Sequence, residues 1–285
     1  MDVLKVAAEM RNMEIRNTIA VYVKAIRDSH RVIKGWWWVL PLAWFVGPSR
    51  YWPKNGIRRL RDYQILVTLN TGAQFVCLLS EVYTIIEVYC RKEYETCLEK
   101  ADHIVDIGSN IGVSVVWFGH KYPTAAIWAI EPTYLTMKRL ITNLHINGMS
   151  GRVDVMSVAV GGKDGFAKLK LGLTSAVASA SRDDSPGLSV STISLASIIE
   201  RVGGTVDLVK IDCEGAEYEF FQEAPDDVIS EIGLVVGEAH SVGSPQHEQL
   251  MLRFRNLGFH VSEYNRNGQY ETFQAVNNRL HENLI

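Results

Sequence analysis

Acidic side chains follow the apolar run Val206–Ile211, at the point where a buried strand would end. Asp212 comes directly after the run, Glu214 follows it, and Gly215 opens a helical segment. Ligands of open α/β sheets bind outside the carboxyl ends of the strands, so carboxylates here can take part in chemistry. We expect Glu214 to point toward a substrate. The alternative for Glu214 and Glu217 is capping of the following helix, because carboxylates suit helix N-termini.

A histidine follows the next apolar run, residues 232–238. His240 and Glu238 are two positions apart, which places them on the same side of an extended chain, and we expect both to lie near Asp212 on the neighbouring strand. Because a histidine titrates near neutrality and can take a proton from a reacting hydroxyl, we predict that His240 is a general base. The alternative is that these three residues ligate a divalent ion, although the preferred prediction contains no metal.

Residues 105–112 form a buried run that ends in a glycine turn before a helical stretch. Gly108 and Gly112 let a ligand approach the backbone, and the helix N-terminus offers N–H groups and positive potential. The G-x-x-x-G spacing differs from those of dinucleotide and phosphate-binding loops, and no lysine follows, which favours a ligand with a carboxylate over a polyphosphate. Glu131 ends the next apolar run, 23 residues after Gly108, and can accept hydrogen bonds from both hydroxyls of a ribose.

Alternating apolar runs and helical stretches from residue 103 onward must position these residues. The expected strands cover residues 103–107, 126–130, 153–160, 206–211, 232–238, 261–264 and 272–276, and the expected helices cover 113–120, 135–147, 194–202, 215–223 and 246–257. Such alternation predicts a mostly parallel sheet with helices on both faces. Residues 172–188 are rich in Ser, Ala, Asp and Gly and indicate a mobile loop or an inserted turn.

Residues 1–100 have a different pattern, which predicts an N-terminal cap of helices and a β-hairpin before a larger domain over residues 101–285. Apolar positions at helical spacing over residues 2–30 indicate one or two helices, and residues 80–100 also have a helical pattern. Two short β-like runs on either side of the Asn-Thr-Gly-Ala turn at residues 70–73 predict the hairpin.

Composition narrows the classes of function. The 285 residues are 47% hydrophobic and 21% charged, which excludes wholesale disorder and allows one large domain or a core domain with an accessory piece. A net charge of −3 argues against a nucleic-acid partner. Four widely spaced cysteines without a C-x-x-C pair, together with no secretory signal in the first 30 residues, predict reduced thiols in a cytoplasmic protein.

The apolar run from Trp36 to Val46 contains four tryptophans and Pro41. Its 11 residues are too few for a transmembrane helix, which needs about 20. We expect this run to pack in the core or against a second subunit of a homo-oligomer. The alternatives are the wall of a substrate pocket and a weak contact with a membrane surface, where tryptophan is favoured.

The sequence resembles the FkbM-type S-adenosylmethionine-dependent methyltransferases over residues 104–261, and the resemblance is much weaker before residue 90. The segments that carry it are VDIGSNIGVS (105–114), IEPTYLTMKRLITNLHING (130–148), VAVGGKDG (158–165), DLVKIDCEGAEYEFF (207–221) and GLVVGEAH (233–240). The KIDCEGAE part is the most specific. The resemblance implies a class I methyltransferase fold, which is a Rossmann-like, mostly parallel seven-stranded sheet with helices on both faces. It also implies S-adenosylmethionine as the cofactor.

The resemblance further implies roles for single residues. Glu131 would bind the ribose of the cofactor, and Ala159 would lie against the adenine. Asp212 would face the ammonium and sulfonium charges. The methionine end would be held by Asp106, Gly108, Asn110 and Gly112.

We therefore expect a methyltransferase that acts on a hydroxyl of a small molecule, sugar or glycan, with His240, Glu214 and Asp212 as catalytic residues. The alternatives are an N-methyltransferase and a catalytically inactive S-adenosylmethionine-binding protein. An Asn/Asp-Pro-Pro-aromatic run, common in methyltransferases of nucleic-acid amino groups, does not occur in the sequence. A nicotinamide-dependent oxidoreductase is disfavoured because the sequence has no G-x-G-x-x-G turn at this position.

Overall fold

The computed structural model describes residues 32–35, 63–171, 178–181, 187–213, 215–240, 243–267 and 270–281. Contacts within the chain divide it into two compact units, Met1–Lys92 and Glu93–Ile285. The helices predicted over residues 2–30 and the tryptophan-rich run of residues 36–46 lie outside the described residues. The predicted division into a cap of residues 1–100 and a domain of residues 101–285 stays a prediction.

The first unit contains the predicted hairpin, which is confirmed. Strands β1 (Gln64–Thr68) and β2 (Gln74–Leu78) pair antiparallel, and Gly72 in the turn between them has a φ of +96°. The helix predicted over residues 80–100 is correct only for its first half. The chain is helical through η2 (Leu79–Glu81), α4 (Val82–Ile85) and the π-helical η3 (Ile86–Cys90), and it then leaves the helix. The helical path stops because Lys92 takes a left-handed conformation, with a φ of +55°.

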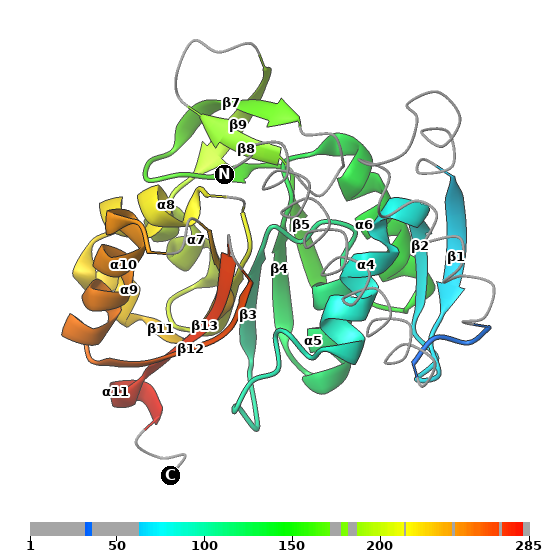
Figure 1. Ribbon diagram of the computed structural model, residues 1–285, viewed down its shortest axis with the longest axis horizontal. Helices are drawn as coiled ribbons and strands as arrows, with labels where there is room; N and C mark the ends of the chain where they lie inside the picture. The colour runs from blue at the N-terminus through cyan, green and yellow to red at the C-terminus, as the bar shows by residue number, and fades with distance from the viewer. Residues whose placement is uncertain are drawn as a thin grey trace, which may run out of the picture. The chain divides into compact units, whose positions relative to one another are not determined.

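The second unit is built on the mostly parallel seven-stranded sheet that the sequence predicts (Figure 1), and this prediction is confirmed. The strand order is β12-β13-β11-β10-β3-β4-β5, and β13 runs antiparallel to both of its neighbours. The central strands are buried on both faces, which explains their almost unbroken apolar sequences. The bounds are β3 (His103–Ile107), β4 (Ala126–Ile130), β5 (Val153–Met156), β10 (Val206–Ile211), β11 (Ile232–His240), β12 (Phe259–Asn267) and β13 (Tyr270–Asn277).

Helices cover both faces of this sheet, as predicted. Helices α5 (Val113–Lys121) and α6 (Tyr134–Ile146) contact each other on one side (Figure 1). The other side carries α7 (Leu195–Val202), α8 (Glu217–Glu223), α9 (Asp226–Ser230) and α10 (Pro245–Asn256). The short helix α11 (Asn278–His281) follows β13. None of the helices in the described ranges has the length and apolar character needed to cross a membrane.

Aromatic packing fixes α8 and α10 against the sheet. The rings of Phe221 and Phe254 meet edge to face with their centroids 5.0 Å apart, and Phe254 lies 5.4 Å from Phe259. All three side chains belong to the core, which also includes Phe220 and Phe273. Such aromatic contacts add about 0.5–1.5 kcal/mol per pair beyond the burial of their area. They therefore hold α8 and its N-terminal residues in a defined position beside the ends of β10 and β11.

A second, four-stranded sheet was not predicted. Strands β6 (Ala159–Val160), β9 (Leu188–Ile193), β7 (Gly165–Leu171) and β8 (Ala178–Ser181) form it in that order. The expectation of a loop or turn over residues 172–188 is therefore wrong for β8 and for the start of β9, while residues 172–177 and 182–186 lie outside the described residues. The sequence ASAS of β8 has no apolar pattern that would predict a strand, and its pairing with β7 appears only in the structure.

Candidate active site at the carboxyl edge of the sheet

The glycine turn after β3 lies against the end of β10. Gly108 has a φ of +72°, and a Cβ atom added there would lie 1.8 Å from the backbone oxygen of Asp212. Asn110 and Gly112 also have positive φ, at +48° and +85°. The backbone N–H groups of Gly108 and Ser109 both donate to the carbonyl of Ile130 at the end of β4. The turn thus needs glycine at position 108 because the neighbouring strand approaches it closely, in addition to the ligand access expected from the sequence.

A buried ion pair lies under this turn. Asp106 on β3 is opposite Lys210 on β10, and Lys210 Nζ is 3.4 Å from Asp106 Oδ1, with both side chains at most 2% exposed. The same ammonium group donates to the carbonyls of Ile107 (3.2 Å) and Gly108 (2.8 Å). Burial alone would lower the pKa of Lys210, but the negative charges of Asp106 and Asp212 outweigh it and raise the pKa. Lys210 is therefore charged and holds the turn.

Sequence reasoning assigned no role to Lys210, although a lysine inside an apolar strand is a visible signal. A charged side chain is rarely buried without a partner, so its position predicts an acidic residue on a neighbouring strand. Only the pairing of β3 with β10 identifies that residue as Asp106.

Glu131 joins the turn after β3 to the segment after β4. Its Oε2 accepts a hydrogen bond from the backbone N–H of Asn110 (3.1 Å), and its Oε1 accepts one from the N–H of Thr133 (2.7 Å). Burial raises the pKa of Glu131, and these hydrogen bonds partly offset that effect. Next to it, Asn110 Oδ1 is buried and accepts no hydrogen bond from any described residue. This side of the turn therefore presents an acceptor to a ligand that donates hydrogen bonds.

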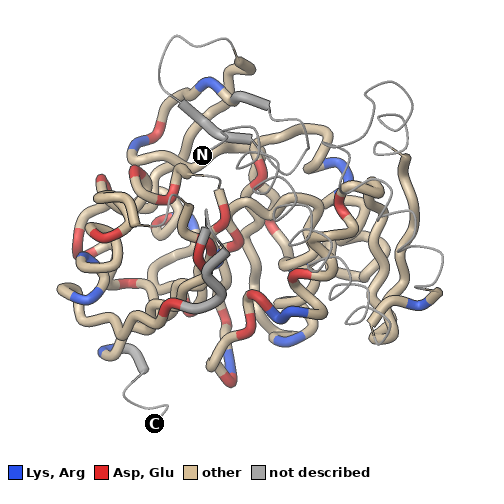
Figure 2. Tube along the Cα trace, viewed as in Figure 1, with Lys and Arg blue, Asp and Glu red and all other residues tan. Residues whose placement is uncertain are grey.

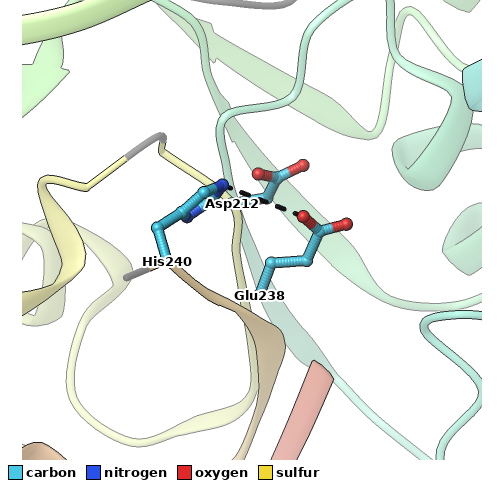
Figure 3. Close-up of side chains that lie close together, drawn as sticks. All are labelled: Asp212, Glu238 and His240. Carbon is cyan, nitrogen blue, oxygen red and sulfur yellow. Dashed lines mark ion pairs between the residues drawn. The ribbon is translucent and has the colours of Figure 1, made fainter. Parts of the chain in front are cut away.

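Three side chains from two neighbouring strands meet at the same edge, and we call them the strand-end triad: Asp212, Glu238 and His240 (Figure 3). One ligand-type atom of each lies within 4.8 Å of those of the other two. His240 Nε2 is 3.9 Å from Glu238 Oε2, and Tyr94 donates a hydrogen bond to Asp212 Oδ2 (3.1 Å). The convergence of these side chains, predicted from strand-end spacing, is confirmed.

Contacts from α8 hold His240 on two sides. Glu217, which is fully buried, accepts a hydrogen bond from the backbone N–H of His240 (2.8 Å), and its Oε1 lies 3.1 Å from His240 Nδ1. Tyr218 donates through its hydroxyl to the carbonyl of His240. Burial would raise the pKa of Glu217, but the hydrogen bonds and charge of His240 outweigh it and hold the pKa below its ordinary value. The sequence reasoning left Glu217 open between a role in the site and a helix cap.

The remaining predicted residues are placed as follows. Ala159 is buried in β6 and pairs with Thr192 of β9. Glu214 lies outside the described residues. The length of α8, the start of α10 and the residues just before these helices line a hollow of about 790 Å³. Its walls include Gly215, Tyr218, Glu219, Gln222, Glu223, Ser244 and Gln246. The predicted roles of Ala159 in cofactor binding and of Glu214 in catalysis stay predictions.

Comparison with known proteins identifies the central part of the chain. The methyltransferase FkbM domain matches residues 106–261, which includes the glycine turn, Glu131 and the strand-end triad. A comparison with curated proteins finds no match.

Several solved structures are similar in fold at low identity. The precorrin-6y C5,15-methyltransferase from Geobacter metallireducens is 12% identical, covers 62% of this chain and 81% of its own, and has a TM-score of 0.40. An O-methyltransferase from Bacillus cereus in complex with SAH is 13% identical, covers 62% of this chain and 74% of its own, and has a TM-score of 0.39. The ribosomal protein L11 methylase from Lactobacillus delbrueckii subsp. bulgaricus is 11% identical, covers 68% of this chain and 79% of its own, and has a TM-score of 0.42. Similarities this weak carry no conclusion about the reaction of this chain.

Proposed function

Because the chain belongs to the methyltransferase FkbM domain family and is an S-adenosylmethionine-dependent methyltransferase, we propose that it methylates a hydroxyl oxygen of a small molecule, sugar or glycan. One observation carries the choice of a hydroxyl. The strand-end triad places an imidazole nitrogen and two carboxylates at the same sheet edge as the glycine turn, and a group that accepts a proton is what a hydroxyl acceptor requires.

The residues around the turn fit the cofactor. Asn110 Oδ1 is a buried acceptor without a partner among the described residues, and the backbone of the acidic residue Asp212 lies against Gly108 of the same turn, so donors and positive charge are both accommodated. In this proposal Glu131 binds the ribose, Ala159 lies against the adenine and Asp212 faces the ammonium and sulfonium. The residues that hold the methionine end are Asp106, Gly108, Asn110 and Gly112.

The bound cofactor supplies an activated methyl group on a positively charged sulfur. The protein then has two tasks, which are to align the acceptor oxygen about 3 Å from the methyl carbon and to accept the proton of the hydroxyl. We assign the proton to Nε2 of neutral His240. As the oxygen–carbon bond forms and the sulfur–carbon bond breaks, the O–H electrons stay on oxygen. The positive charge moves to the imidazole, next to the carboxylates of Asp212 and Glu238. Glu214 points toward the acceptor in this proposal.

The first experiment is calorimetric titration of the purified protein with S-adenosylmethionine, with NAD as the control. We expect micromolar binding of S-adenosylmethionine alone, followed by transfer of a labelled methyl group to a hydroxylated acceptor in a screen.

Asp106→Ala and Glu131→Ala should weaken cofactor binding. His240→Ala should lower turnover and leave cofactor affinity nearly intact, because the ring acts on the acceptor. A His240→Ala enzyme with the full rate would contradict the base role. Binding without turnover on any acceptor would favour an inactive binding protein, and labelling only at nitrogen would favour an N-methyltransferase.

A second route to the same reaction is favoured by one observation. Two carboxylate oxygens and one imidazole nitrogen within 4.8 Å of each other can hold a divalent cation, which would lower the pKa of the acceptor hydroxyl. With His240 as the base, we expect activity to be unchanged after dialysis against EDTA. Loss of activity that Mg²⁺ or Mn²⁺ restores would favour the cation.

The proposed acceptor, rather than a nucleic acid, is supported by the distribution of charge. Figure 2 shows acidic and basic residues interspersed along the described chain. A cytoplasmic location is supported by the four cysteines, all within the described ranges, which form no disulfide.

A further inference from the structure

Glu217 makes contacts that a simple helix cap would not make. Its Oε2 accepts a hydrogen bond from the backbone N–H of Gly215 (2.8 Å), which precedes the helix, and lies 3.6 Å from the thiol sulfur of Cys213. Its Oε1, however, turns toward the end of β11 and meets both the backbone N–H and the ring Nδ1 of His240. A single buried carboxylate thus joins the loop after β10, the start of α8 and the residue proposed as the base.

The protonation of this carboxylate follows from its surroundings. The backbone N–H groups of Gly215 and His240 can only donate, and each donates to one oxygen of the Glu217 carboxylate. Glu217 is therefore ionised and only accepts hydrogen bonds. A neutral imidazole at 3.1 Å from Oε1 must then carry its hydrogen on Nδ1, because a bare Nδ1 would face the lone pairs of a carboxylate.

The other ring nitrogen, Nε2, faces the carboxylate of Glu238 at a longer distance than Nδ1 faces that of Glu217. Figure 3 shows the His240 ring directed toward Asp212 and Glu238, and Nε2 is 3.9 Å from Glu238 Oε2. With the hydrogen on Nδ1, the Nε2 lone pair points to the side of the sheet edge where the acceptor hydroxyl is proposed to bind. Tyr218 fixes the His240 carbonyl, so the backbone of His240 is held at both its N–H and its C=O.

We propose that Glu217 is the positioning residue of the methyl transfer reaction: it holds neutral His240 in the Nδ1–H form so that Nε2 can take the proton. This inference rests on the proposed O-methyltransferase function, because it assigns a task to the proposed base. Glu217 touches neither the cofactor nor the acceptor in this arrangement and acts through His240. In a catalytic triad, replacing the equivalent acid by its amide lowers kcat by up to about 10⁴-fold by changing the tautomer.

The test compares Glu217→Gln with Glu200→Gln, a matched change on an exposed residue of helix α7 outside the site. The first readout is the ¹⁵N NMR spectrum of the imidazole, with the His240 signals assigned by their absence in His240→Ala. We expect Nδ1–H in the wild type and in Glu200→Gln, and a shift toward Nε2–H in Glu217→Gln. The second readout is kcat with the acceptor found in the labelled-methyl screen. We expect it to fall at least about 100-fold in Glu217→Gln alone, with S-adenosylmethionine affinity within about twofold of wild type.

An Nε2–H tautomer in the wild-type protein would overturn the inference even if Glu217→Gln fails to fold. So would a Glu217→Gln enzyme with wild-type kcat. These results are separable from failure of the proposed function, because the tautomer is measured without an acceptor. A wild-type protein with the Nδ1–H tautomer that methylates no hydroxyl would leave the pair intact and reject the O-methyltransferase assignment.

Discussion

Lys210 shows how much a single side chain contributes to this site. Its ammonium group pairs with Asp106 and donates to two carbonyls of the glycine turn, and the ring of Tyr94 lies 5.1 Å from it. A buried lysine with these partners orders the backbone that is proposed to hold the methionine end of the cofactor. The cost of burying it is offset only while the carboxylate opposite it is present.

Replacing this lysine tests the argument. We expect Lys210→Met to lower the free energy of unfolding by about 3–5 kcal/mol, because it leaves the carboxyl group of Asp106, whose pKa burial already raises, without its partner. The measurement is urea unfolding at neutral pH. The matched control is Lys163→Met, whose ion pair with Glu223 is largely solvent-exposed and should change stability by at most about 1 kcal/mol. Equal effects of the two substitutions would show that the buried pair does not stabilise the fold.

Among the elements, the turn between β3 and α5 is held in place by contacts from several of its neighbours. It is held from β4 by the carbonyl of Ile130, from β10 by the backbone of Asp212, and from below by Lys210. Glu131 adds a contact from the segment after β4. A substitution that removes one of these contacts should therefore change the conformation of the turn and the binding of the cofactor more than it changes the rest of the sheet.

Two glycines with nearly the same φ separate the effect of conformation from that of crowding. Gly108 (φ +72°) meets the Asp212 carbonyl, whereas Gly148 (φ +71°), after α6, has nothing within 4 Å of an added Cβ. Gly148→Ala should cost about 1–2 kcal/mol for the left-handed conformation alone. Gly108→Ala should cost more and should also weaken S-adenosylmethionine binding. Unfolding and calorimetric titration of both variants provide the measurement, and equal losses in the two would contradict the role of close approach.

For the whole molecule, the site lies at one edge of the large sheet, where β3, β10 and β11 end and where α8 begins. The buried carboxylate of Glu217 links two of these strand ends to α8. Its pKa is lowered in the folded protein, so ionised Glu217 stabilises the fold above the unfolded-state pKa, about 4.3 for a glutamate. That contribution is lost as the pH falls through the lower, folded-state value.

Acid stability should therefore depend on this residue. We expect Glu217→Gln to be less stable than wild type near neutrality and to lose less stability than wild type between about pH 6 and about pH 3. The difference between the two proteins removes the effect of the other carboxylates. Urea unfolding across this range gives the comparison. A wild-type protein and variant whose stabilities fall in parallel would show that Glu217 is not preferentially ionised in the folded state.

The sequence by itself determined most strands and helices of the large sheet in the second unit, the glycine turn and the meeting of Asp212, Glu238 and His240. These features follow from local signals, because apolar periodicity marks the elements and parallel strands bring their carboxyl ends to one edge. The family also follows from short segments that can be read directly.

The tertiary structure alone decided which side chains become partners. Tyr94 donates to Asp212, which is 118 positions away in the chain, and Lys210 pairs with Asp106 only through the register of β10 with β3. The same holds for Glu217 and His240, and for the pairing of β6 to β9 into a second sheet, although β7 (GFAKLKL) and β9 (LSVSTI) alternate apolar and polar residues. Such contacts depend on strand register and on how α8 packs against the core, and neither is encoded in the spacing of residues along the chain.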